Sequence, residues 1–169
     1  MQHVIAALAR DGFSDLVVNH AWLGARIEAV LGDGRRLGVR IRYSPEPEGA
    51  LETGGGIRNA LELLGDEPFL AVNGDVWTDV SFAALPREPE GLAHLVLVDN
   101  PPHNPDGDFA LEGTRVLAAG PDRRTFSGIG VYRPALFASR APGRFALAPL
   151  LREAMGRGEV TGERHGGRW

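Results

Sequence analysis

Short apolar runs alternate with stretches of helical periodicity along the first half of the chain. Residues 22–31 place apolar side chains at helical spacing and end at Gly32, whereas residues 39–43 alternate as a half-buried strand does. Residues 69–72 form a continuous apolar run, typical of a strand that is covered on both faces. The pattern predicts strands within residues 16–18, 39–43 and 69–72, and helices over 3–10, 22–31 and 57–64.

The second half has a different texture, with a turn-rich loop over residues 100–107. The elements expected there are strands at 92–98 and 126–132, a hairpin of 108–111 with 115–118, and a helix at 147–155. Strands alternating with helices indicate an α/β sheet built from right-handed crossovers, in one domain spanning 1–169. The chain begins inside a helix with no strand before it, and a further strand could start after Gly166. We therefore expect a domain that is incomplete at both ends.

The amino-acid composition excludes several kinds of function and chemistry for this protein. The 169 residues are 43% hydrophobic, which suffices for one globular core. The net charge of -4 argues against a nucleic-acid binder. Cysteine and lysine are both absent, which excludes disulfides, thiol catalysis, a P-loop lysine and a Schiff base. No apolar run reaches the roughly 18 residues of a membrane span and no signal peptide precedes the domain, so we expect a soluble, cytoplasmic protein with no membrane partner.

The strongest local signal is Asn73-Gly74-Asp75, directly after the apolar run at 69–72. Ligands of open α/β sheets bind at the carboxyl ends of the strands, so a carboxylate there is well placed. Asp75 could hold Mg²⁺, a hard cation that prefers oxygen ligands and often bridges protein and phosphate. The same three residue types are also common in plain turns, and spacing alone leaves both interpretations open.

A triple glycine, Gly54 to Gly56, follows Glu52 and Thr53 and opens the helix expected at 57–64. Glycine lets a ligand approach the backbone, and a helix N-terminus offers free N–H groups. The segment matches neither the Walker nor the dinucleotide fingerprint, so a flexible loop capped by Thr53 is the competing interpretation.

Weaker candidates flank the later strands. Gly107 with Asp108, and Ser127 with Gly128, could line a pocket, although a β-bulge explains the last two equally well. The five histidines show no metal-ligand spacing, and no nucleophile elbow is present.

Taken together, these segments resemble the sugar-phosphate nucleotidyltransferases, also called nucleoside-diphosphate-sugar pyrophosphorylases. The matching stretches are residues 17–23, 43–46, 51–57, 72–77, 92–100, 107–109 and 125–130. Within the family, the combination looks most similar to the bacterial N-acetylmuramate 1-phosphate uridylyltransferases of cell-wall recycling, with mannose-1-phosphate guanylyltransferases as near neighbours. The resemblance implies a Rossmann-like, mostly parallel sheet of the nucleotide-diphospho-sugar transferase type, here without its first strand.

The resemblance also implies a reaction. A sugar 1-phosphate oxygen attacks the α-phosphorus of a nucleoside triphosphate, such as UTP, and pyrophosphate leaves, with Mg²⁺ neutralising phosphate charge. Asp75 would be the metal ligand and catalytic carboxylate, and Asn73 would contact substrate. Glu52, Thr53, Gly54 and Gly55 would lie near the base and ribose. Gly107, Asp108, Ser127 and Gly128 would border the sugar.

Two family features have no counterpart in this sequence. They are the G-x-G-x-R loop with its Pro-Lys-Pro segment, which cradles the triphosphate, and a second metal-binding Asp in a V-D-V-G-T segment. Three hypotheses therefore stand: a uridylyltransferase, a non-catalytic sugar-nucleotide-binding relative, and an inactive fragment. The base, the sugar and the oligomeric state stay open.

Overall fold

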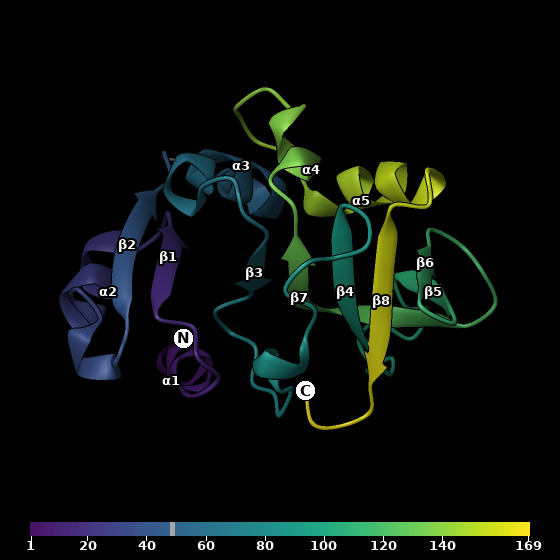
Figure 1. Cartoon of the computed structure of the whole chain (residues 1–169), viewed down its shortest axis with the longest axis horizontal. Coiled ribbons are helices and arrows are strands. Elements are labelled where there is room, and N and C mark those ends of the chain that lie inside the picture. The colour runs from purple at the N-terminus through teal and green to yellow at the C-terminus, as the bar shows by residue number, and fades with distance from the viewer. Residues whose placement is uncertain (48–49) are drawn as a thin grey trace.

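The computed structural model describes residues 1–47 and 50–169, and its strands form two groups (Figure 1). β1 (Asp15–His20) and β2 (Arg40–Pro45) pair in parallel as a small sheet. The larger sheet has six strands in the order β3-β7-β4-β8-β6-β5. Its strands are β3 (Phe69–Val72), β4 (Ala93–Val98), β5 (Phe109–Glu112), β6 (Arg115–Leu117), β7 (Arg123–Tyr132) and β8 (Val160–His165).

The six-stranded sheet is mixed in direction. β7 runs antiparallel to both of its neighbours, β3 and β4, so β3 and β4 share one direction, and β8 lies parallel to β4. The α/β architecture is confirmed, as is the parallel pairing of β1 with β2. The expectation of a mostly parallel sheet needs one correction: β7 sits between β3 and β4, and β6 also runs against its neighbours. A long strand from the second half of the chain can insert between β3 and β4 because hydrogen bonding satisfies its backbone in either direction.

Helices cover both faces of the large sheet. On one face, α1 (Gln2–Arg10) places Val4 and Leu8 against Val96 and Ile129. On the other face, α3 (Glu52–Leu64) and α5 (Leu147–Gly156) pack over Leu95 and Leu97. Alternate residues of β4 thus enter different cores, which explains why its sequence is continuously apolar. α2 (Gly24–Leu31) packs against the small sheet and the short α4 (Ala135–Ala138) precedes α5.

The boundaries of two helices differ from those the sequence predicted. α2 begins at Gly24, not at residue 22, because Leu23 adopts a left-handed backbone with φ of 57° that cannot continue into a helix. α3 begins at Glu52, so the triple glycine lies inside the helix instead of before it. The predicted hairpin is confirmed as β5 and β6. β8 and α4 were not predicted, and residues 166–169 form no strand.

None of the helices in the described part of the chain reaches the length and apolar character that crossing a bilayer requires.

Candidate functional site

A groove of about 700 Å³ lies between β1 and β3, the facing strands of the two sheets (Figure 1). Its walls are residues 15–19 of β1 and 69–72 of β3, and α1 and α3 contribute side chains on either side of it. Asn19, at the end of β1, and Asn73, just beyond β3, both line it. The groove therefore runs along both strands and reaches their carboxyl ends, where α/β sheets bind ligands.

A second cavity of about 450 Å³ adjoins this groove. Glu52, Thr53 and Asn73 line both spaces, and Asp108 lines the second one together with Phe109. Four of the residues that the sequence singled out are thereby brought to one place from three distant parts of the chain.

Asn73 owes its position to Gly128. The Asn73 backbone N–H donates to the Gly128 carbonyl at 3.0 Å, and Gly128 has φ of +79°. A Cβ at residue 128 would lie 2.5 Å from the Asn73 amide nitrogen. Glycine is required there for both its backbone angle and this close approach, so Gly128 shapes the site through Asn73.

Asp75 lies in the turn after β3, where the Val76 N–H donates to the Asn73 carbonyl at 3.2 Å. Its side chain is exposed and lies outside both cavity linings. Within residues 1–47 and 50–169 its carboxylate forms no hydrogen bond or ion pair, and no group of three acidic or histidine side chains gathers for a metal. A single free carboxylate fits a Mg²⁺ ion whose other ligands are water and substrate phosphate.

Glu52 is the first residue of α3, and its carboxylate accepts a hydrogen bond from Arg144 Nε at 2.9 Å. Thr53, the next residue, makes no side-chain cap for this helix. Both side chains are exposed and point to the shared part of the two cavities.

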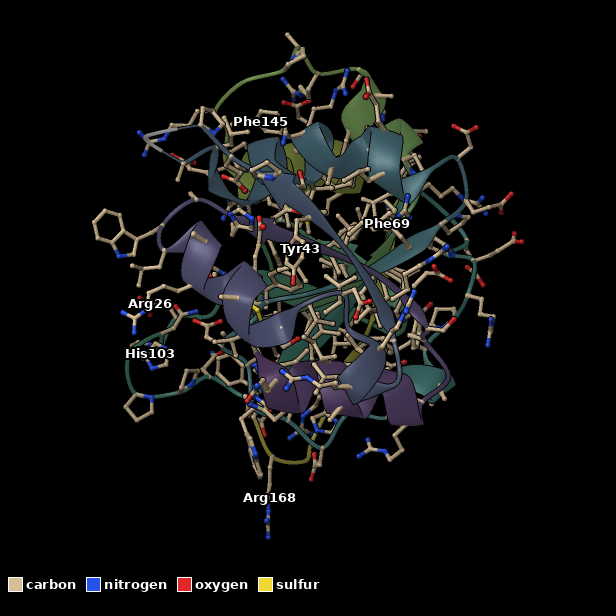
Figure 2. The ribbon with its side chains drawn as sticks, turned by 90° about the vertical axis from the view of Figure 1, so that its left-hand side faces the viewer. Arg26, Tyr43, Phe69, His103, Phe145 and Arg168 are labelled. Atoms are coloured by element: carbon tan, nitrogen blue, oxygen red, sulfur yellow. The ribbon has the colours of Figure 1, made fainter. Side chains whose placement is uncertain are left out.

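Gly54 and Gly55 are buried and serve packing. A Cβ on Gly54 would lie 2.6 Å from the Phe145 ring, and one on Gly55 would lie 2.2 Å from the Gly143 carbonyl oxygen. Figure 2 shows Phe145 beside α3. Neither glycine lines either cavity, so close contact with residues 143–145 is the structural reason for both.

Ser127 is 1% exposed, and its hydroxyl donates to the Val96 carbonyl at 2.7 Å while accepting the Ile129 N–H. Both hydrogen bonds of this hydroxyl are therefore made to backbone groups of the sheet and not to a ligand. Gly107 has φ of +62° and leads into Asp108, whose carboxylate accepts the Phe126 N–H at 2.8 Å. This bond fixes Asp108 at the wall of the second cavity.

Sequence reasoning missed two charged clusters near the strand ends. Asp79 accepts hydrogen bonds from the Arg168 N–H and from His165, and these lower the pKa of its carboxyl. Asp99, just beyond β4, binds Arg164 of β8 in a two-point contact, and this lowers its pKa in turn. The partners are more than 60 residues apart in the chain, so no local pattern could reveal them. The Arg168 side chain itself points away from the molecule (Figure 2).

The model of the nucleotidyl transferase family matches residues 1–109, which include α1, the groove and the Asn73–Asp75 turn. The chain belongs to the nucleotidyl transferase family.

Individual relatives are similar over nearly the whole chain. An N-acetylmuramate alpha-1-phosphate uridylyltransferase from Neisseria meningitidis serogroup B is 51% identical over 98% of this chain and 75% of its own length. A protein of the same name from Caulobacter vibrioides is 29% identical over 100% of this chain and 76% of its own.

Solved structures share the fold at lower identity. A putative glucose-1-phosphate thymidylyltransferase from Bacillus anthracis, solved with sucrose, superposes with a TM-score of 0.82. That match has 15% identity and covers 99% of this chain and 74% of the other. An inositol-1-phosphate CTP transferase from T. maritima gives 0.73 at 17% identity, covering 98% and 72%. These likenesses confirm the α/β fold expected from the sequence, with its sheet of the sugar nucleotidyltransferase type.

Proposed function

We propose that this protein transfers UMP from UTP to N-acetylmuramate 1-phosphate and releases pyrophosphate. The observation that carries the proposal is the 51% identity to a uridylyltransferase of that sugar across 98% of the chain. The site supports it, because a groove and a cavity share Glu52 and Thr53 at the start of α3 and Asn73 after β3, so substrates bound in the two spaces would lie side by side.

The chemistry consists mainly of positioning and charge stabilisation. A non-bridging oxygen of the sugar 1-phosphate forms a bond to the α-phosphorus of UTP. The bond from that phosphorus to the oxygen that bridges the α and β phosphorus atoms breaks, and this oxygen leaves as a terminal oxygen of pyrophosphate. Asp75 would hold Mg²⁺ against the phosphates, and when bound the ion would neutralise their negative charge.

The chain's own residues would orient the two substrates. Glu52 and Thr53 lie at the shared wall, on the side proposed for the base and ribose. Gly54 and Gly55 line neither space and would act indirectly, by holding the start of α3 against residues 143–145. Asn73 would contact the reacting phosphates between the two spaces.

The second cavity would receive the sugar. Asp108 offers hydroxyl-binding oxygens there, and Gly107 sets its position. Ser127 acts through the sheet and Gly128 through Asn73. We place the reaction in cell-wall recycling and in the cytoplasm, within a single domain over residues 1–169, with no nucleic acid or membrane as partner.

The test is pyrophosphate release from UTP and N-acetylmuramate 1-phosphate with Mg²⁺, comparing the wild type with Asp75→Asn. We expect the variant to lose at least about 100-fold in rate, because one preorganised electrostatic contact is typically worth that much. Asp66→Asn removes another exposed carboxylate, just before β3, and should leave the rate unchanged. Equal rates for Asp75→Asn and the wild type would contradict the role of Asp75.

Substrate choice is tested in the same assay. Faster release from GTP and mannose 1-phosphate would replace our proposal with a guanylyltransferase. Tight binding of UDP-N-acetylmuramate without pyrophosphate release from any pair would identify a non-catalytic binder instead. Without substrate, a single carboxylate with water ligands should bind Mg²⁺ no more tightly than millimolar.

A further inference from the structure

Arg152, on α5, lines the second cavity, and its guanidinium carbon lies over the Phe109 ring, 5.4 Å from the ring centre. The ring is 2% exposed and fixed in the core, so it offers the cation a rigid support. Within residues 1–47 and 50–169, the Arg152 guanidinium forms no ion pair and no hydrogen bond. Five N–H donors therefore remain for a ligand.

The other charged groups around this cavity already have partners. Glu52 is paired with Arg144 at 2.9 Å, and the Asp108 carboxylate accepts the Phe126 N–H at 2.8 Å. Arg152 is thus the one cation of this lining; it is exposed, and no described residue forms an ion pair with it. An anionic group on the ligand would balance it.

The position of Arg152 indicates which part of the substrate would carry this anionic group. Asn73 lines both spaces, and the proposed function places the reacting phosphates beside it. Arg152 lines the second cavity but not the groove, as do Phe109 and Leu147. A charge met there lies on the body of the sugar, away from its phosphate.

We propose that Arg152 determines specificity for a sugar 1-phosphate that carries a carboxylate on its ring substituents. This rests on the proposed function, whose sugar bears a lactyl carboxylate on its C3 oxygen. A guanidinium binds a carboxylate with two parallel N–H···O bonds, which gives both energy and direction. A neutral hexosamine offers no carboxylate to this guanidinium, which then stays hydrated.

The test compares N-acetylmuramate 1-phosphate with N-acetylglucosamine 1-phosphate, which has the same phosphate and N-acetyl group without the lactyl carboxylate. We expect Arg152→Gln to lower kcat/KM for the muramate about tenfold or more, mainly through KM, because a charged hydrogen bond is lost. Values for the glucosamine should stay unchanged. Arg152→Lys should recover part of the loss. Arg157→Gln changes an arginine at the end of the same helix that pairs with Glu159 outside the cavity, and should behave as the wild type.

Each outcome separates the two proposals. An equal fall for both sugars would overturn the inference, since Arg152 would then serve the phosphate or the fold. An active wild type with an unchanged Arg152→Gln variant would also overturn it, while leaving the uridylyltransferase proposal intact. The wild type could also fail to distinguish the two sugars, with equal rates for the two sugar 1-phosphates and equal calorimetric affinities for UDP-N-acetylmuramate and UDP-N-acetylglucosamine. That result would refute both the proposed sugar and the inference.

Discussion

The contact between Gly128 and Asn73 shows how one missing Cβ shapes a binding site. The backbone at residue 128 has a positive φ that costs an L-residue about 1–2 kcal/mol. The Asn73 side chain also fills the space where a Cβ at residue 128 would lie. Sequence reasoning selected Gly128 for close approach to a ligand or for a bulge. The structure shows close approach to another residue of the site.

Gly128→Ala should therefore destabilise the protein by more than the backbone cost alone and should weaken substrate binding by displacing Asn73. Gly113→Ala is the matched control, because Gly113 has φ of +60° and a Cβ added there would meet nothing within 4 Å. That variant should lose about 1 kcal/mol of unfolding free energy and retain ligand binding. Equal losses in denaturant melts and equal ligand affinities for the two variants would show that the Asn73 contact has no energetic role.

Asp99 gives a prediction about pH. Its pKa is lowered from 3.8 by the hydrogen bonds from Arg164 and by the charges of Arg164 and Arg124. A lowered native pKa means that the carboxylate stabilises the fold above its unfolded pKa and that this stabilisation disappears as the pH falls through the native value. Asp99→Asn should thus melt at a lower temperature than the wild type at pH 7, by a small margin because the pair is exposed. The two melting temperatures should converge below pH 3.8. A constant difference across the acid range would indicate a steric origin instead.

At the scale of elements, the spacing of apolar residues predicted those helices and strands whose own sequence shows which side chains are buried. β3 matches its predicted range, and β4 and α5 match theirs within one residue at each end. β8 escaped prediction because its sequence is polar at four of six positions and its strand conformation depends on pairing with β4 and β6. The start of α3 escaped for a related reason: glycine is a poor helix former, and the packing of residues 143–145 compensates for that. Of the candidate site, the sequence supplied the strand-end polar residues, whereas Arg152 and Asp99 needed the tertiary structure.

The packing at α3 is itself testable. Gly55→Ala would bring a Cβ to 2.2 Å from the Gly143 carbonyl oxygen, so the backbone must shift, and we expect a loss of about 1–3 kcal/mol in unfolding free energy. The shift should also disturb the Glu52–Arg144 pair and the second cavity. Gly156→Ala, at the last residue of α5 with open space around its Cβ, should be neutral or gain up to about 1 kcal/mol. A neutral Gly55→Ala would mean that the contact with residues 143–145 is loose.

At the scale of the whole molecule, the groove between the two sheets has a physical consequence. The edges of β1 and β3 that face it pair with no other strand in the described part of the chain. The side chains along it include Leu16, Val17 and Val18, and all of β3 is only half-buried. An edge that is apolar and unpaired is a template for pairing with another chain, whereas Arg40 on the outer strand β2 discourages such pairing there.

We therefore expect this chain to self-associate as its concentration rises, through strands entering the groove. Sedimentation velocity should show a concentration-dependent shift to larger species. Val17→Lys, which puts a charge into the groove wall, should reduce it. Val30→Lys is the matched control, because Val30 is 54% exposed on α2 and lies outside the groove, so its substitution should leave the association unchanged. Suppression by Val30→Lys but not by Val17→Lys would move the interface to α2 and its exposed neighbour Trp22. A monomer at every concentration would show that the two sheet edges, held apart by α1 and α3, are closed to further strands.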